Sequence, residues 1–219
     1  MTAPTELPLR LVVAGTDTDV GKTMVSALLV RALQASYWKP VQCGDLAVGG
    51  DSARVAQLAG LTVAEAAGRI LPEAYRLAAP ASPNQAAAAE GLVVQEETLQ
   101  LPAVAGPLVV ECAGGLLVPL RDDLLQITMI DRWQLPVVLV ARSGLGTLNH
   151  TLLSLEALNR RGIPVLGLVL NGEPHGANRS SLERIGRVPV LLELPPLADP
   201  GPAALDAAWT RFRVPGCSA

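Results

Sequence analysis

The sequence has few aromatic residues, few cysteines and no clustered positive charge. Aromatic residues make up 3% of its 219 positions, so alanine, valine and leucine, within a hydrophobic share of 50%, must fill the core. Cys43, Cys112 and Cys217 are far apart and lack the spacing of a zinc site or a disulfide scaffold. The formal net charge is −3 and there is no run of lysine or arginine, which argues against nucleic acid as a partner.

The sequence also shows no targeting or membrane-spanning segment. Residues 1–8 lack a basic region followed by an apolar core, so they do not resemble a signal peptide. No uninterrupted apolar run approaches the roughly 20 residues that a bilayer-spanning helix needs. We therefore expect one domain over residues 1–219, cytoplasmic and with no membrane partner.

Short apolar runs alternate with amphipathic stretches along the chain. Several runs are almost continuous in valine and leucine, which is typical of strands buried on both faces of a parallel sheet. The alternation predicts an α/β fold with a doubly wound, mostly parallel sheet and helices on both faces. Expected strands cover 10–14, 37–41, 107–111, 136–141, 165–170 and 188–194; expected helices cover 22–34, 51–58, 96–104, 124–133, 148–160, 180–185 and 202–211, with 71–91 as an excursion over the sheet.

The most informative motif is the stretch 15–23, Gly-Thr-Asp-Thr-Asp-Val-Gly-Lys-Thr. It lies between an expected strand and an expected helix, so its backbone N–H groups and the helix N-terminus favour an anion. Lys22 can reach terminal phosphate oxygens, and the Thr23 hydroxyl can ligate magnesium. A plain strand-to-helix turn is the alternative, but the flanking elements favour a variant P-loop, one residue longer than the common form. The fold is then of the P-loop NTPase type.

Charged residues follow two further strands. Lys39 lies in an apolar strand, where burial is costly unless the ammonium meets an anion; an extended side chain reaching solvent is the alternative. Glu111 ends a valine-rich strand, as does the magnesium-holding carboxylate of many phosphoryl-transfer enzymes; capping of the next turn is the alternative. Since ligands bind at the carboxyl ends of parallel strands, we expect both residues beside the P-loop.

Three weaker signals accompany these. Asp51 opens an expected helix and, from local pattern alone, is an N-cap. Asn171 is either a turn residue or a reader of a purine edge. The stretch 142–150 is expected to form an anion- or polar-group-binding turn at a helix N-terminus, with His150 as a helix-start residue.

The chain resembles the dethiobiotin synthetase family over most of its length. The long P-loop with its Thr-Asp-Thr core, together with Lys-Pro-Val, is the most specific part of the resemblance. The motifs that carry it are the P-loop at 15–23, Lys39-Pro40-Val41, Ser82-Pro83, Val110-Glu111-Cys112-Ala113-Gly114-Gly115 and Leu145-Gly146-Thr147-Leu148-Asn149-His150-Thr151.

This resemblance implies an ATP-dependent cyclo-ligase. Its substrates are 7,8-diaminopelargonic acid and CO2, and one amine takes up CO2 as a carbamate. The carbamate attacks the γ-phosphate of ATP to give a carbamic-phosphoric anhydride, and the second amine closes the ring with release of phosphate. The family implies Mg²⁺ as cofactor and a homodimer with the substrate near the subunit interface.

The resemblance also implies roles for individual residues. Lys22 and Lys39 stabilise the charge of phosphoryl transfer, and Thr18 lies near the carbamate. Magnesium is held by Thr23, Asp51 and Glu111. Expected ATP contacts are Asp19, Val20, Gly21, Lys22, Thr23, Met24, Asp51, Glu111, Cys112, Ala113, Gly114, Asn171, Gly172, Leu192, Glu193, Leu194 and Asp199; expected substrate contacts are Cys43, Gly114, Thr147 and Asn149.

Four positions depart from the usual family pattern: Cys43, Asn84, Cys112 and Leu192. None removes a charged group, so they bear on substrate and nucleotide contacts rather than on phosphate chemistry. Another class of protein, the partition or Min-type nucleotide switch, usually carries an additional lysine early in the P-loop, and residues 16–20 contain none. An amidotransferase-linked cobyrinate-type synthetase would need a glutaminase region, for which the chain is too short.

Overall fold

The centre of the molecule is a six-stranded parallel sheet. The computed structural model describes residues 7–213, so Cys217 and residues 1–6 lie outside it. The spatial order of the strands is β10-β9-β8-β1-β5-β2, and every pairing between them is parallel. Their bounds are β1 Arg10–Gly15, β2 Ser36–Trp38, β5 Leu108–Gly115, β8 Val137–Arg142, β9 Val165–Asn171 and β10 Val190–Leu194.

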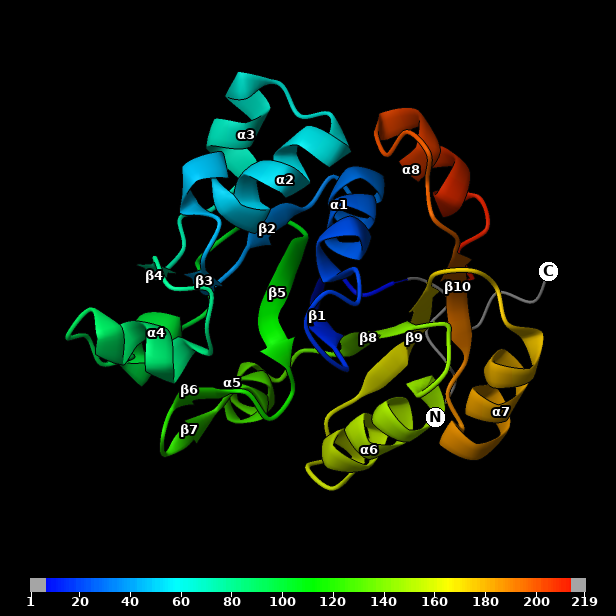
Figure 1. Ribbon diagram of the computed structural model, residues 1–219. Coiled ribbons are helices and arrows are strands. Elements are labelled where there is room, and N and C mark those ends of the chain that lie inside the picture. Colours follow the sequence, from blue (N-terminus) through cyan, green and yellow to red (C-terminus); the bar gives the residue numbers. More distant parts are fainter. Residues whose placement is uncertain (1–6, 214–219) are drawn as a thin grey trace.

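Helices cover both faces of this sheet (Figure 1). One core cluster joins alternate strand residues to α1 (Lys22–Ala32), α2 (Gly50–Ala59) and α8 (Pro202–Trp209). The other joins the opposite faces of the strands to α4 (Pro83–Ala89), α5 (Gln126–Trp133), α6 (Thr147–Asn159) and α7 (Gly176–Gly186). Strands such as β1 are therefore buried on both sides, which is why they read as continuous apolar runs. The expected fold class is confirmed.

The connections differ from the expectations in several places. The expected strand 37–41 is divided at Lys39–Pro40, because proline has no N–H for a ladder: β2 ends at Trp38, and β3 (Val41–Cys43) pairs with β4 (Tyr75–Leu77). The expected helix 96–104 is wrong beyond a short 3₁₀ turn, Glu96–Leu99, with Pro102 close behind it. Not expected were α3 (Val63–Arg69), the 3₁₀ turn Leu46–Val48 and the hairpin β6 (Pro119–Arg121) and β7 (Leu124–Leu125).

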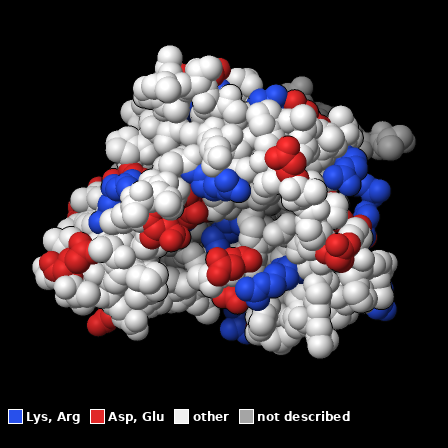
Figure 2. All heavy atoms as spheres, turned by 45° about the horizontal axis from the view of Figure 1, so that its top comes forward, with Lys and Arg blue, Asp and Glu red and all other residues white. Residues whose placement is uncertain are grey.

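The surface bears mixed charge. On the face shown in Figure 2, acidic and basic side chains lie next to one another, with no broad area of one sign. Within residues 7–213, no helix has both the length and the apolar character needed to cross a membrane.

Candidate functional site

The turn between β1 and α1 forms a cradle at the carboxyl end of the sheet. Asp19 and Gly21 adopt positive φ angles of 53° and 95°. A Cβ on Gly21 would lie 2.1 Å from Asn171 Nδ2, so only glycine fits there. Since no side chain caps the helix, the first N–H groups of α1 and its positive dipole end remain available for an anion.

Lys22 is the first residue of α1 and is buried in this turn. Its Nζ donates a hydrogen bond to the carbonyl oxygen of Asp17 at 2.8 Å, and its side chain lines the cavity described below. Burial lowers the pKa of Lys22, the Glu111 carboxylate opposes that effect, and the nearby Lys39 ammonium adds to it. The protein's own groups therefore compensate the buried Lys22 ammonium only in part.

Thr23, Lys39, Asp51 and Glu111 meet beside Lys22. The Thr23 hydroxyl lies 3.0 Å from both Asp51 Oδ1 and Glu111 Oε1. Lys39 Nζ forms ion pairs with Asp51 and with Glu111, whose Oε1 lies 3.4 Å away. Burial lowers the pKa of Lys39, but the Glu111 and Asp51 carboxylates outweigh it, and the net shift is upward. The four side chains form a compact cluster of opposite charges.

The fold explains why these residues meet. Lys39 follows the last residue of β2, and Glu111 lies on the neighbouring strand β5. Asp51 is in the first turn of α2, whose N-cap is Gly49, so the interpretation of Asp51 as a plain cap is wrong. Its carboxylate instead reaches across to Thr23 and Lys39.

A cavity of about 740 Å³ opens over this cluster. The chain contains two lysines, Lys22 and Lys39, and both line this cavity. Its volume lies in the range of small-molecule sites. Expected site residues that line it are Thr18, Asp19, Gly21, Lys22, Thr23, Lys39, Cys43, Asp51, Glu111, Ala113, Gly114 and Asn171; the other lining residues are Gln42, Asp45, Pro80, Ala81, Ser82, Pro83 and Val118.

The residues expected near adenine divide into two groups. Asn171 lines the cavity, and its Nδ2 donates to the carbonyl oxygen of Val20 at 3.1 Å. Leu192 and Leu194 point into the core, and Glu193 is held by Arg179 at 3.0 Å, so these side chains do not line the cavity. The cavity is also not lined by five other expected ATP contacts: Val20, Met24, Cys112, Gly172 and Asp199.

Thr147 and Asn149 also lie away from this cavity. Both are in the first turn of α6. The Thr147 hydroxyl donates to the carbonyl oxygen of Arg142 at 2.5 Å, and Asn149 is exposed. Within one chain, neither residue lines the cavity around the two lysines.

Three buried residues that the sequence did not single out support the site. Tyr37 donates to Glu111, Gln42 Oε1 accepts from the backbone N–H of Asp51 at 3.1 Å, and Gln126 Oε1 accepts from that of Ala113 at 3.3 Å. Gln42 also donates to the carbonyl oxygen of Gly44 at 3.1 Å. Tyr37 and Gln42 are polar residues within apolar runs, and this pattern in the sequence could have identified them as residues that support the site.

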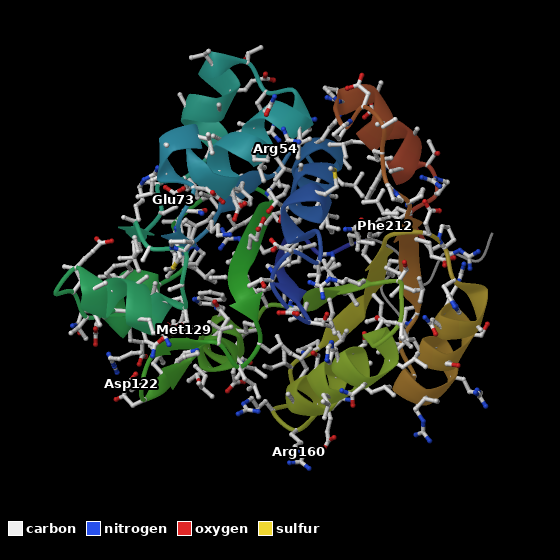
Figure 3. The ribbon with its side chains drawn as sticks, in the orientation of Figure 1. Arg54, Glu73, Asp122, Met129, Arg160 and Phe212 are labelled. Atoms are coloured by element: carbon white, nitrogen blue, oxygen red, sulfur yellow. The ribbon has the colours of Figure 1, made fainter. Side chains whose placement is uncertain are left out.

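A hydrogen-bonded rim borders the cavity, and two protonated cysteines lie in or near it. Ser82 donates to Asn84, and Asn84 donates to Asp122 Oδ1 at 2.9 Å on the β6–β7 hairpin, where Figure 3 labels Asp122. Burial raises the pKa of Cys43 to about 11 and that of Cys112 to about 12, so both thiols are protonated at neutral pH. Cys43 therefore offers the cavity a weak thiol donor rather than a charge.

Comparison with solved structures identifies the fold. The chain superposes with a TM-score of 0.53 on the apo McdA structure from Cyanthece, at 12% identity, covering 93% of this chain and 90% of that one. It superposes with a TM-score of 0.50 on the septum site-determining protein MinD from Pyrococcus horikoshii, at 15% identity, covering 85% and 81%. These similarities show the P-loop NTPase fold alone.

Sequence comparison identifies the family. Residues 9–204 match a family model described as an AAA domain. The chain is 52% identical to the ATP-dependent dethiobiotin synthetase BioD of Rhodopseudomonas palustris (strain BisB18), covering 91% of this chain and 93% of that protein. It is 49% identical to the protein of the same name from Agrobacterium fabrum (strain C58), covering 94% of each. The chain, with its P-loop and its paired lysines in one cavity, belongs to the family of ATP-dependent dethiobiotin synthetases.

Proposed function

We propose that this protein carboxylates 7,8-diaminopelargonic acid with CO2 and closes the ureido ring through a carbamic-phosphoric anhydride, with residues 1–219 acting as one synthetase domain. Family membership gives the overall activity, the ATP-dependent formation of dethiobiotin in biotin biosynthesis. The observation that carries the proposed chemistry is the convergence of Lys22 and Lys39 with two carboxylates in one cavity.

The first steps build up negative charge. A substrate amine attacks CO2 and loses a proton to become a carbamate, whose oxygen then attacks the γ-phosphorus of ATP while ADP leaves. Both the carbamate and the transferring phosphoryl group are anionic, so two ammonium groups fixed in the cavity lower the barrier electrostatically. We assign that role to Lys22 and Lys39, and place Thr18, which lines the cavity, near the carbamate.

We assign Thr23, Asp51 and Glu111 to Mg²⁺. Asp51 Oδ1 and Glu111 Oε1 each lie 3.0 Å from Thr23 Oγ1, and hydroxyl and carboxylate oxygens are the hard ligands that this ion prefers. When bound, Mg²⁺ neutralises phosphate charge during transfer. Within residues 7–213, no group of three or more His, Cys, Asp or Glu side chains is placed to hold a metal ion by itself. We propose that phosphate oxygens of the nucleotide add to the two carboxylates, as is usual for Mg²⁺.

Ring closure depends on position. The second amine attacks the carbonyl carbon of the anhydride, and phosphate leaves with the C–O bonding pair, so the cavity must hold both amines near one carbon. Cys43 and Gly114 line the cavity where they can contact the substrate. For the nucleotide, we assign adenine contacts to the Asn171 amide and to the backbone of 192–194, because the side chains there are engaged elsewhere.

Substrate dependence tests this mechanism. Purified protein is expected to release phosphate from ATP and form dethiobiotin only when Mg²⁺, bicarbonate and 7,8-diaminopelargonic acid are all present, as followed by phosphate release and mass spectrometry. A nine-carbon acid with one amine is the matched control, since it lacks the nucleophile for ring closure and should give no cyclic product. Phosphate release that ignores the diamine would instead indicate a nucleotide switch.

We also propose that the protein acts as a homodimer. A second cavity of about 430 Å³, lined by Leu116, Leu117, Val118 and α6 residues including Leu153, adjoins the first, because Val118 lines both. Leu117, Leu145 and Leu153 are 56%, 107% and 57% exposed. Apolar surface of this kind favours a protein contact. A second copy placed here would bring Thr147 and Asn149 of one chain toward the substrate carboxylate in the other.

Leu153→Asp is expected to convert the dimer to monomers and to raise KM for the diamine while leaving the fold intact. The added carboxylate would be desolvated in the contact without a partner, which disfavours association. Light scattering during size-exclusion chromatography measures the change. Val63→Asp is the matched control, because Val63 is 90% exposed on α3, away from this groove. A dimer that survives Leu153→Asp unchanged would remove this surface from the interface.

A further inference from the structure

Tyr37 and Glu111 lie on the same face of neighbouring strands. β2 and β5 pair in parallel, with Tyr37 opposite Val109. Because side chains alternate along a strand, Glu111 projects to the same face as Val109, about 6.6 Å further along. A tyrosine side chain that leans along its strand can span a spacing of this size. The pairing register therefore brings the phenol oxygen beside the carboxylate.

The two side chains make a direct hydrogen bond inside the core. Tyr37 Oη donates to Glu111 Oε2 at 3.0 Å, and both residues are 0% exposed. The other carboxylate oxygen, Oε1, lies 3.0 Å from the Thr23 hydroxyl and 3.4 Å from Lys39 Nζ. The two oxygens of Glu111 thus have different surroundings, one in the core and one in the cation cluster.

The torsion that orients this carboxylate is intrinsically soft. The terminal χ3 angle of glutamate is broad and roughly two-fold, so the strand alone does not fix the plane of the carboxylate. A buried carboxylate oxygen without a donor is costly, and the phenol O–H supplies that donor. Packing alone does not account for the hydroxyl, because a phenylalanine ring would fill the same space between the strands and α1.

We infer that Tyr37 is a positioning residue for the magnesium-nucleotide site: its hydroxyl holds Glu111 Oε2 and so presents Oε1 toward Thr23 and the bound nucleotide. The inference rests on the proposed magnesium role of Glu111. Tyr37 touches neither ATP nor substrate in this arrangement, since it does not line the cavity.

Tyr37→Phe tests the role, because it removes only the oxygen. In EDTA, the ADP affinity of the variant should stay within about two-fold of wild type. The Mg²⁺ concentration that gives half of the Mg²⁺-dependent gain in ADP affinity should rise about ten-fold. Isothermal titration calorimetry at several Mg²⁺ concentrations measures both. The turnover rate at saturating Mg²⁺ should recover toward wild type. Such recovery would show that the Glu111 carboxylate is misoriented, and that the metal site itself is not lost. Urea denaturation monitors folding separately.

Tyr75→Phe is the matched control. The Tyr75 hydroxyl accepts from the backbone N–H of Gln95 at 2.8 Å and lies 3.1 Å from the Thr98 hydroxyl, away from the cavity. This variant also loses a hydroxyl that makes hydrogen bonds, but at a place away from the cavity, and should keep the wild-type Mg²⁺ dependence. Combining Tyr37→Phe with Glu111→Gln should change that dependence no further than Glu111→Gln alone, because the hydroxyl acts through that carboxylate.

The outcomes distinguish the inference from the function on which it rests. Wild-type Mg²⁺ dependence in Tyr37→Phe, with dethiobiotin still formed, overturns the role of Tyr37 and leaves the reaction intact. ADP binding that ignores Mg²⁺ in the wild-type protein overturns the metal assignment and the inference together. A ten-fold shift in Tyr37→Phe, absent from Tyr75→Phe, supports it.

Discussion

Replacing Lys39 with methionine is expected to lower kcat/KM for dethiobiotin formation by about 10³-fold. The ammonium is buried beside Asp51 and Glu111, where a charge acts strongly on the anionic transition state. The same change leaves the fully buried Glu111 without its cation, so unfolding free energy should fall by about 3 kcal/mol. Steady-state kinetics and urea denaturation measure the two effects.

An exposed ion pair provides the control for this change. Arg160→Met breaks the pair between Arg160 and Glu156, whose side chains are 74% and 54% exposed at the outer end of α6 (Figure 3). It should leave activity and stability close to wild type, because exposed pairs are screened by water. Near-normal turnover in Lys39→Met would remove Lys39 from the mechanism and would leave the protein with a generic NTPase site.

Replacing Lys22 with methionine is expected to have an equal effect on activity and an opposite effect on stability. Turnover should fall by about 10³-fold, since in the proposed mechanism Lys22 is the second cation beside the transferring phosphoryl group. In the part of the chain that the structure describes, Lys22 makes a hydrogen bond to a carbonyl and no ion pair within 4 Å. Its burial is therefore poorly compensated, and the unbranched methionine side chain should make the ligand-free protein as stable as wild type or more so.

The lowered pKa of Lys22 provides a second test of its unfavourable burial. Because folding lowers this pKa below 10.5, the unfolded chain binds more protons between the folded value and 10.5. Stability in that pH window should rise with pH through this group in the wild type, and the contribution should be missing in Lys22→Met. Urea denaturation of both proteins across the window measures it. Equal destabilisation by Lys22→Met and Lys39→Met would contradict the expectation that Lys39 stabilises the fold through its ion pairs whereas Lys22 does not.

The central part of the site was predictable because its information is local or follows from the sheet. The P-loop is a contiguous motif, and Lys39 and Glu111 stand out as charged residues in otherwise apolar expected strands. Since parallel strands share one carboxyl edge, the pattern predicts that these residues meet, and the ion pair between them confirms it.

Asp51 and Tyr37 show where sequence patterns were insufficient. An aspartate that opens a helix has the same local pattern whether it caps the helix or reaches a threonine 28 positions away. The contact of Tyr37 with Glu111 depends on the pairing register of β2 and β5, which no local pattern specifies. The expected helix 96–104 failed for a related reason, because apolar spacing alone did not weigh Pro102.

The scarcity of lysine has a practical consequence. Every side-chain cation outside the cavity is an arginine or a histidine, so the two ε-amino groups and the chain's α-amino group are the primary amines available to acylating or alkylating reagents. Reductive ¹³C-methylation would therefore place side-chain reporter signals only in the cavity that Lys22 and Lys39 line, with one further signal from the α-amino group. Acylation of Lys22 or Lys39 would remove an ammonium charge from the cavity, and with it the charge on which the proposed reaction depends.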